Sequence, residues 1–403
     1  MIAALLLAAV LTVQGQDVVF DQWFTGGTLR LDCLREGSAG GDSVRIVRAV
    51  DRQADWHGSR TQLIDPFDNG DYRMELRDPR SGRVLYSRCF SNLFREYKDT
   101  PEGRTTARSF EETFLVPMPR GEVTVALQRR DSGLRFVDQR VEVFAPEPVR
   151  MARVPSVTAE AYEWHGDPSV KLDVAFVMQG FDGVDPEEYD RVRRRMVGVL
   201  FGKEPFRSHR DDFNVYFVRG DAGVEYNTFG ADRYAMTFRL WQLHDVLGQT
   251  PADHIIIVIN NETYGGGAIY NFYSVSSLHA MAESVLPHEL GHGIGGLADE
   301  YVDEDLSYAD LHRTAYEPLE PNITNLVDFG SKWQHLLPEG TQVPTPDVKV
   351  PRTENGPTGV YEGAGYSSKG VYRPAMHCMM RDYAPFCPVC RERLEAVIKL
   401  YTR

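Results

Sequence analysis

The sequence is poor in basic residues and, apart from its first residues, has no long hydrophobic run. Lys and Arg number 44 against 58 Asp and Glu, which gives a formal net charge of -14. Binding to nucleic acid requires a basic face, so this balance argues against a nucleic-acid partner. After residues 1–13 no apolar run approaches the about 18 residues that a membrane-spanning helix needs. We therefore expect neither a nucleic-acid partner nor a membrane span.

The first 13 residues form an apolar block that is too short to span a bilayer. Val13 and Gly15 then supply small or compact residues in front of Gln16. No Lys or Arg precedes the block, but a secretory signal peptide over residues 1–16 is still the favoured interpretation. The mature protein is therefore expected to be secreted, in the periplasm or outside the cell.

Cysteine is scarce, with five residues, and the odd number leaves one over. In an exported protein we expect cysteines to form disulfides. Cys33 and Cys89 form the natural pair in the first half, and Cys378 pairs with either Cys387 or Cys390 in the second. Cys387 and Cys390 also have the spacing of a redox or zinc-knuckle motif, but no second such pair occurs. A structural disulfide is therefore the favoured interpretation.

The length of the chain and a change in its pattern predict two domains. At 403 residues the chain exceeds what one hydrophobic core usually holds. Residues 18–145 contain short alternating segments joined by turns, with no convincing helix and no catalytic pattern. They predict an antiparallel β-sandwich domain over residues 17–146, followed by a proline-containing linker at residues 146–149. Strand and helix patterns then alternate from residue 170 to 259, as in an α/β core.

One stretch of the second half carries the residues of a zinc hydrolase. Positions four apart lie on one face of a helix, so His288 and His292 can present two imidazoles to one metal ion. Glu289 stands beside the same pocket and can take a proton from a water that zinc activates. Glycines just past His292 would end the helix. The pattern predicts a Zn²⁺ site with Glu289 as the general base.

The position of the third metal ligand depends on which glycine ends this helix. In the metzincin pattern, His-Glu-x-x-His-x-x-Gly-x-x-His or Asp, the glycine turns the chain back toward the metal. Counting from His288 places that ligand at Ala298, which cannot bind zinc. If Gly296 rather than Gly295 makes the turn, the same interval leads to Asp299. The expected zinc ligands are therefore His288, His292 and Asp299, with Glu300 as the alternative third ligand.

Residues 265–275 precede the histidine helix and begin with three glycines. A glycine turn that leads into an alternating, aromatic strand at this point is the arrangement of an edge strand above a zinc cleft. An edge strand can bind an extended peptide through its free N–H and C=O groups. A plain hairpin strand fits the pattern equally well. On the first interpretation, the partner is a protein or peptide substrate bound along this edge.

Residues 288–301, together with residues 361–366 and 378–381, resemble the M64 family of secreted bacterial metallopeptidases, the IgA-peptidase-like family. That family joins an N-terminal β domain to a metzincin-like catalytic domain, so the resemblance covers nearly the whole mature chain. It implies a mixed fold, α+β and α/β, with a metzincin-like α/β zinc-peptidase domain over residues 147–403. It also implies a secreted zinc-dependent endopeptidase, which we expect to be a monomer.

The resemblance also suggests roles for residues after the zinc ligands. Metzincins place a methionine in a tight turn beneath the metal ligands, where it packs under the histidines without binding metal. Met380 is the better match and Met379 the alternative. In several metzincins a tyrosine shortly after this turn stabilises the oxyanion. Tyr383 is similar, although one residue further on, and Tyr366 on a glycine-flanked loop is the other candidate.

Two other functions remain compatible with the sequence. The chain could be a secreted module that binds glycan or protein, in which the metal site is vestigial or structural. A structural zinc site has four protein ligands and no open position, whereas a catalytic site keeps a water. The chain could also be an amidase that acts on non-peptide or cell-wall amide bonds with the same zinc chemistry.

Overall fold

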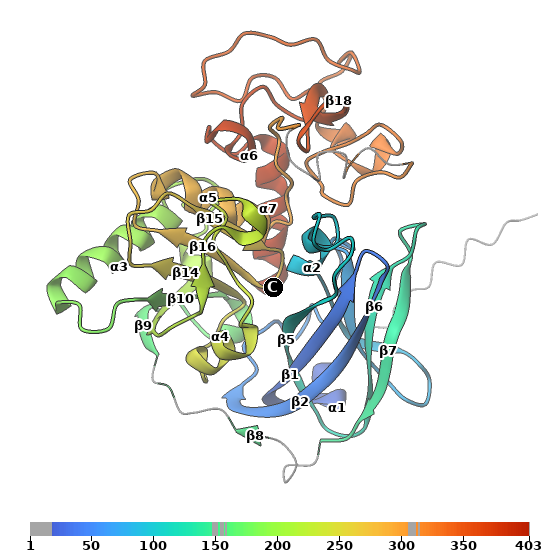
Figure 1. Ribbon diagram of the computed structural model, residues 1–403, viewed down its shortest axis with the longest axis vertical. Helices are drawn as coiled ribbons and strands as arrows, with labels where there is room; N and C mark the ends of the chain where they lie inside the picture. The colour runs from blue at the N-terminus through green and yellow to red at the C-terminus, as the bar shows by residue number, and fades with distance from the viewer. Residues whose placement is uncertain are drawn as a thin grey trace, which may run out of the picture.

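The computed structural model describes residues 18–146, 152–153, 157, 159–304, 312 and 315–402. The predicted signal peptide, residues 1–16, and residues 147–149 of the predicted linker lie outside the described residues. Figure 1 shows a β-rich part, coloured blue to teal, beside a larger part that runs from green to red and contains most of the helices. The chain is a mixed α/β protein with several antiparallel sheets.

Two four-stranded sheets, both mainly antiparallel, form the β-rich part. Leu29 and Leu31 of the first sheet are fully buried, and they share one hydrophobic core with Met74 and Leu76 of the second. This arrangement is compatible with the expected sandwich. In sheet order the strands are β5 (Arg108–Pro119), β1 (Phe24–Ser38), β2 (Gly41–Asp55) and β8 (Ala152–Arg153), then β4 (Val84–Phe90), β3 (Tyr72–Arg77), β6 (Val123–Arg130) and β7 (Phe136–Phe144).

The β-rich part also contains two short helices, although the sequence pattern suggested none. α1 (Phe20–Trp23) precedes β1, and α2 (Leu93–Tyr97) follows β4. Asn92 caps α2 by accepting a hydrogen bond from the backbone N–H of Arg95 at 3.2 Å. Neither helix reaches two turns, so no hydrophobic period could reveal it. α2 matters for function because Arg95 and Glu96 line the main cavity.

A six-stranded sheet organises the rest of the chain. Its four inner strands are parallel, and both edge strands run antiparallel to their neighbours. The order from edge to edge is β15 (Gly266–Ile269), β16 (Tyr273–Ser277), β14 (His254–Ile259), β10 (Leu172–Gln179), β11 (Phe213–Arg219) and β9 (Glu160–Glu163). The main helices are α3 (Pro186–Leu200), α4 (Leu240–Leu247), α5 (Ala282–Gly293) and α7 (Pro388–Tyr401).

Both faces of this sheet are covered, as the apolar sequence of β10 requires. On one face Val174 and Phe176 share a core with residues of α3, α5 and α7. On the other face Ala175 and Val177 share a core with α4 and with the β-rich part. The β-rich part is therefore packed on the second face of the sheet. The buried side chain of Arg52, on β2, connects the β-rich part to the segment after α4, where it donates to the carbonyl oxygens of residues 248 and 250 at 2.7 and 2.6 Å.

The glycine-rich segment before α5 forms the edge of the sheet. The sequence predicted a glycine turn before the strand, but Gly266 and Gly267 lie within β15, and Gly265 directly precedes it. The aromatic segment that follows provides β16, and the two strands form an antiparallel hairpin. The segment is therefore both a hairpin and an edge strand.

The described residues from 315 onward begin above the sheet and the β-rich part in Figure 1, and α7 runs from there down to the C-terminus. Their regular elements are few, and long turns connect them. The strands and α-helices described in this region are β17 (Tyr361–Ala364), β18 (Ser367–Arg373), α6 (Met379–Asp382) and α7. A separate short pair, β12 (Val224–Glu225) and β13 (Met236–Thr237), lies earlier in the chain.

The structure corrects both predicted disulfides, because all five cysteines are free and buried. Cys33 lies on β1 and Cys89 on β4, which belong to different sheets. Cys378 and Cys390 approach each other, but their sulfur atoms are 3.7 Å apart. A disulfide bond is about 2.05 Å long. The three cysteines of the second half thus form a group of thiols.

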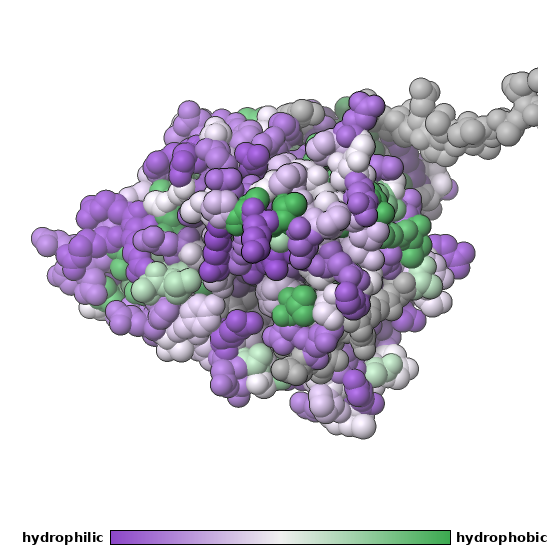
Figure 2. Space-filling model, turned by 90° about the horizontal axis from the view of Figure 1, so that it is seen from above, coloured by the Kyte–Doolittle hydropathy of each residue, from purple (hydrophilic) through white to green (hydrophobic). Residues whose placement is uncertain are grey.

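Of the helices that the structure describes, none is long and apolar enough to cross a membrane. Figure 2 shows the molecule from above, and hydrophilic side chains predominate on this face among the residues drawn in colour. Hydrophobic side chains form small separate patches there. This face therefore offers mainly polar contacts.

Candidate metal centre

Helix α5 carries the histidine motif and is anchored by its apolar side. Leu286 and Leu290 are fully buried in the core that α5 shares with α3 and α7. His288 and His292, one turn apart, lie on the other side of the helix and line a cavity of about 570 Å³. The packing of the leucines therefore sets the direction in which the two imidazoles point.

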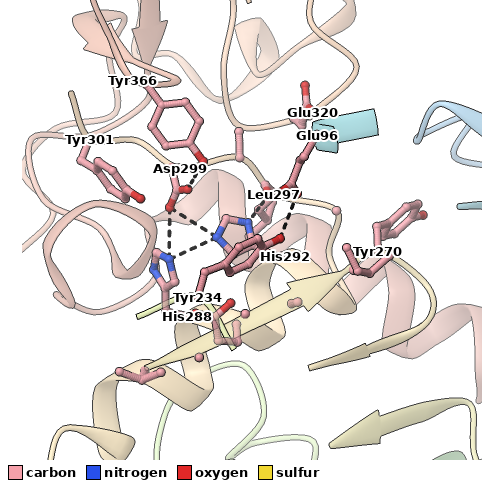
Figure 3. A pocket seen from close by; sticks show the side chains of 18 of the residues that line it. Glu96, Tyr234, Tyr270, His288, His292, Leu297, Asp299, Tyr301, Glu320 and Tyr366 are labelled. Atoms are coloured by element: carbon pink, nitrogen blue, oxygen red, sulfur yellow. Dashed lines mark hydrogen bonds and ion pairs between the residues drawn. The ribbon is translucent and has the colours of Figure 1, made fainter. Parts of the chain in front are cut away.

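The two histidines and Asp299 converge on one point, as Figure 3 shows. The Oδ1 atom of Asp299 lies 3.1 Å from Nε2 of His288 and 3.3 Å from Nε2 of His292. The two Nε2 atoms are 3.1 Å apart. In a tetrahedral zinc site with ligands at 2.0 to 2.1 Å, neighbouring ligand atoms are separated by about 3.4 Å. The triangle is thus close to the size that zinc requires.

Hydrogen bonds to backbone carbonyls orient both imidazoles. Nδ1 of His288 lies 3.0 Å from the oxygen of Met379, and Nδ1 of His292 lies 2.7 Å from the oxygen of Leu297. A carbonyl only accepts, so each Nδ1 carries the proton and each neutral ring leaves Nε2 with a lone pair. Among the described residues, the buried Oδ1 of Asp299 receives no hydrogen bond. When both rings are neutral, three lone-pair atoms face one another, an arrangement that a cation stabilises.

The pKa shifts of His292 and Asp299 in the metal-free protein also indicate a site that favours a cation. Burial lowers the pKa of His292, but the Asp299 carboxylate outweighs this effect and raises the pKa to about 9. Burial alone would raise the pKa of Asp299, yet the two histidines, His292 foremost, hold it well below its usual range. The cluster therefore attracts positive charge, and protons compete with a metal ion for it.

A tight turn brings Asp299 back to the helix. Gly296 has a φ of +60°, a left-handed conformation that favours glycine, whereas Gly295 is not among the glycines with positive φ. Asn69, in the β-rich part, donates to the carbonyl oxygen of Gly296 at 3.1 Å. A Cβ atom on Gly296 would come within 2.1 Å of the Asn69 amide nitrogen. Both the backbone angle and this contact require glycine at position 296.

The neighbours of Asp299 face elsewhere. The backbone N–H of Ala298 donates to Asn322 at 2.7 Å. The carboxylate of Glu300 accepts from Asn322 Nδ2 at 2.9 Å and belongs to a separate group that contains three cysteines. Of the two candidate third ligands, the structure therefore brings Asp299 to the histidines.

Glu289 and the edge strand meet in the same cavity. A Cβ atom on Gly266 of β15 would lie 3.1 Å from Oε1 of Glu289 and 2.7 Å from a methyl carbon of Val285. A glycine is needed here because the strand passes so close to the helix. Burial raises the pKa of Glu289, and the neighbouring histidines offset only part of this rise.

Residues 378–380 lie beneath the histidine helix, at the start of α6. A Cβ atom on Gly291 would lie 2.4 Å from the sulfur of Met380, so this side chain packs directly against α5. Met379 contributes its carbonyl oxygen to His288. The carbonyl oxygen of Met380 accepts from the backbone N–H of Glu300 at 2.8 Å. This short segment thus supports both helix α5 and the loop that carries Asp299.

Both candidate tyrosines line the cavity, but in different relations to the ligand group. The hydroxyl of Tyr366 donates to Oδ2 of Asp299 at 2.5 Å (Figure 3). The ring of Tyr383 lies 5.6 Å from the ring of His288, and its hydroxyl is 2.9 Å from that of Tyr264. Tyr366 therefore contacts a candidate ligand, whereas Tyr383 lines the cavity beside the ring of His288 and contacts Tyr264.

The structure adds residues that the sequence did not reveal. Asn69, Arg95 and Glu96 reach the cavity from the β-rich part. The hydroxyl of Tyr234 donates to Oε1 of Glu96 at 2.9 Å. Burial raises the pKa of Glu96 to about 7. No motif links Asn69, Arg95 and Glu96 to α5, because they lie more than a hundred positions away in the chain.

The fold and the site together define a class: a mixed α/β protein whose main cavity carries a candidate metal-ligand group. A family profile described as Peptidase M64 N-terminus matches residues 19–139, and one described as IgA Peptidase M64 matches residues 217–356 and 351–398. The chain belongs to the M64 peptidase family, which confirms the resemblance found in the sequence. A comparison with curated proteins found no match.

Proposed function

We propose that this chain is a secreted, zinc-dependent endopeptidase with a metzincin-like catalytic domain over residues 147–403. The observation that supports zinc most directly is the triangle of lone-pair atoms from His288, His292 and Asp299. Two neutral imidazoles and a carboxylate are a typical catalytic zinc set, which leaves a fourth position open. Membership of the M64 family supports peptide as the substrate.

Each residue of the site has a distinct role in this proposal. Zinc, when bound, would polarise the scissile carbonyl and acidify a water molecule. Glu289 accepts the proton of that water and returns it to the leaving amine. Its burial supports this role, because a raised pKa makes the carboxylate a better proton acceptor. Tyr366 positions Asp299, and Tyr383 donates to the developing oxyanion.

The edge strand provides a place for the substrate backbone. The outward N–H and C=O of Gly266 already pair with residues 233 and 235, at 3.1 Å each. Peptide groups alternate in direction along a strand, so Ala268 turns its N–H and C=O toward the same side. Ala268 also lines the cavity. We propose that an extended peptide pairs with Ala268 and runs past Glu289.

The β-rich part, residues 17–146 in this proposal, forms one wall of the substrate cleft. Asn69, Ser91 and Arg95 of this part line the cavity together with the histidines. Arg95 forms an ion pair with Asp71 at 2.7 Å, which holds its guanidinium in place. Its positive charge could contact an acidic side chain or a carbonyl of the substrate.

A peptide-library digest with the purified mature chain tests the proposal. Cleavage should occur inside peptides, stop with a chelator and return when zinc is added. Glu289→Gln should lower kcat/KM by about 10² to 10⁴-fold, since this range is typical of a general acid–base group. The variant should bind zinc like the wild type, because Glu289 is not a ligand. Glu283→Gln, at an exposed position of the same helix, is the matched control and should stay active.

Full activity of Glu289→Gln would contradict the role of Glu289. Cleavage that persists after complete removal of metal would contradict zinc dependence. Zinc binding without any cleavage of peptides would instead favour a binding module with a structural metal.

A further inference from the structure

A second cluster of potential metal ligands lies apart from the histidine group. It contains Cys378, Cys387, Cys390 and Glu300, and their ligand atoms all lie within 4.8 Å of one another. The sulfur of Cys378 is 3.7 Å from that of Cys390, and the sulfur of Cys390 is 3.2 Å from Oε1 of Glu300. Three separate segments supply these side chains: the turn after α5, the start of α6 and the start of α7.

The distances are too long for a disulfide and fit a tetrahedral metal site. With metal–sulfur bonds of about 2.3 Å, neighbouring sulfur atoms in a tetrahedral site are separated by about 3.8 Å. The observed 3.7 Å between Cys378 and Cys390 is close to that value. A sulfur and a carboxylate oxygen on one zinc would be about 3.5 Å apart, near the observed 3.2 Å between Cys390 and Glu300.

The carboxylate of Glu300 provides independent support. The side chain is fully buried, and the second oxygen, Oε2, has no hydrogen-bond partner among the described residues. A buried carboxylate oxygen without a partner carries a large desolvation cost, which a bound cation would remove. Asn322 holds the other oxygen at 2.9 Å and so fixes the direction of the group.

The position of Cys387 at the beginning of α7 also favours a thiolate. Cys387 is the N-cap of this 14-residue helix, and Cys390 lies in its first turn. The positive end of a helix dipole stabilises negative charge at the N-cap. The Cys-Pro-Val-Cys spacing thus places the sulfur atoms of Cys387 and Cys390 on the same side of one helical turn.

We propose that Cys378, Cys387, Cys390 and Glu300 form a second metal site, a closed structural Zn²⁺ site with three thiolate ligands and one carboxylate. Soft thiolate ligands select zinc over magnesium or calcium, and four protein ligands leave no position for substrate. This site does not depend on the peptidase proposal.

Its location suggests what the second metal would do. Glu300 directly follows Asp299, and its backbone N–H is bonded to the carbonyl oxygen of Met380. Cys378 precedes Met379, whose carbonyl oxygen orients His288. A metal bound here would tie the segment of Asp299, the methionine segment and α7 together. It would therefore stabilise the back of the histidine site from outside the substrate cavity.

Zinc content and zinc X-ray absorption of the full chain, purified without chelator, test this proposal. Wild-type protein should contain two zinc ions per chain, and the absorption spectrum should show sulfur neighbours at about 2.3 Å. His288→Ala/His292→Ala should retain one zinc, with the sulfur signal enriched. Cys387→Ser/Cys390→Ser should lose one zinc and the sulfur signal. Cys33→Ser/Cys89→Ser changes two buried cysteines outside the cluster and should keep both ions.

The two proposals fail separately in this experiment. If only the histidine site is wrong, the protein holds one zinc with sulfur ligands. A wild-type spectrum without sulfur neighbours would overturn the second site, as would a disulfide between Cys378 and Cys387 or Cys390 in peptide mass spectrometry. If the double serine variant does not fold, the spectrum of the histidine variant still decides, because it retains all four proposed ligands.

Discussion

Asp299 and Glu300 are neighbours in the chain, yet their carboxylates enter two different ligand groups. Oδ1 of Asp299 lies 3.1 Å from His288 Nε2, whereas Oε1 of Glu300 lies 3.2 Å from the sulfur of Cys390. The direction of each side chain is set by its own partner, Tyr366 for Asp299 and Asn322 for Glu300. A single dipeptide therefore links the proposed catalytic and structural sites.

The first prediction separates these two carboxylates. Asp299→Asn should raise the zinc concentration that restores half of the peptidase activity by more than about 100-fold, since loss of an outer-shell partner alone costs about 10 to 100-fold. Glu300→Gln should shift this concentration far less, because its carboxylate faces the cysteines. Zinc titration of metal-free protein, with peptide cleavage as the readout, measures both. The reverse order would assign the third catalytic ligand to Glu300.

The second prediction distinguishes the two tyrosines. Tyr366→Phe removes the hydroxyl that donates to Asp299, so it should weaken zinc binding by about 10 to 100-fold. Tyr383→Phe should leave zinc affinity unchanged and lower kcat by about 10² to 10³-fold, as expected for loss of an oxyanion donor. Zinc titration of both variants, followed by measurement of kcat at saturating zinc, tests this. A loss of kcat confined to Tyr366→Phe would exchange the two roles.

The third prediction concerns the turn at Gly296. Gly296→Ala should destabilise the metal-free protein by at least about 1 kcal/mol, because alanine is strained at a φ of +60° and its Cβ meets Asn69. Displacement of Asp299 should weaken zinc binding as well. Thermal unfolding in chelator and zinc titration measure the two effects.

Asn69→Ala provides the control for that turn. The double variant Asn69→Ala/Gly296→Ala removes the steric contact but keeps the strained backbone angle. We expect it to recover part of the stability lost in Gly296→Ala alone, once the cost of Asn69→Ala is subtracted. Simple additivity of the two losses would show that Asn69 does not constrain the turn.

The fourth prediction concerns pH and a buried carboxyl far from the metal. Burial raises the pKa of Asp173 to about 8, and the backbone N–H of Asp173 donates to Asp253 at 2.9 Å. The ordinary pKa of an aspartate is about 3.9, so the folded state holds this proton more tightly than the unfolded state. The stabilisation is complete below about pH 4 and is lost as pH rises toward 8. The free energy of unfolding should therefore fall over this range.

Urea unfolding of wild type and Asp173→Asn between pH 5 and 9 measures this effect. The variant cannot ionise at this position, so its stability should depend less on pH than that of the wild type. Asp182→Asn, at an exposed position, should follow the wild-type curve. Equal slopes for wild type and Asp173→Asn would show that this carboxyl does not couple folding to protons.

The sequence alone was sufficient for features with a local pattern. Helical spacing predicted one helix through His288 and His292, and α5 is that helix. The alternating strand and helix patterns from residue 170 to 259 predicted an α/β core, and β10 occupies the centre of its sheet. Motifs at residues 288–301, 361–366 and 378–381 together were enough to indicate the M64 family, which the family profiles confirm. These features follow from interactions between residues close in the chain.

The tertiary structure decided what depends on distant contacts. Whether residue 299 or 300 faces the histidines depends on the turn at Gly296, and Asn69, in a loop of the β-rich part, donates a hydrogen bond to this turn. The pairing of cysteines also required three dimensions, because Cys33 and Cys89 belong to different sheets while Cys378 lies beside Cys390 and Glu300. A side chain's partner is set by the packing of whole elements, and the spacing of residues along the chain does not contain that information.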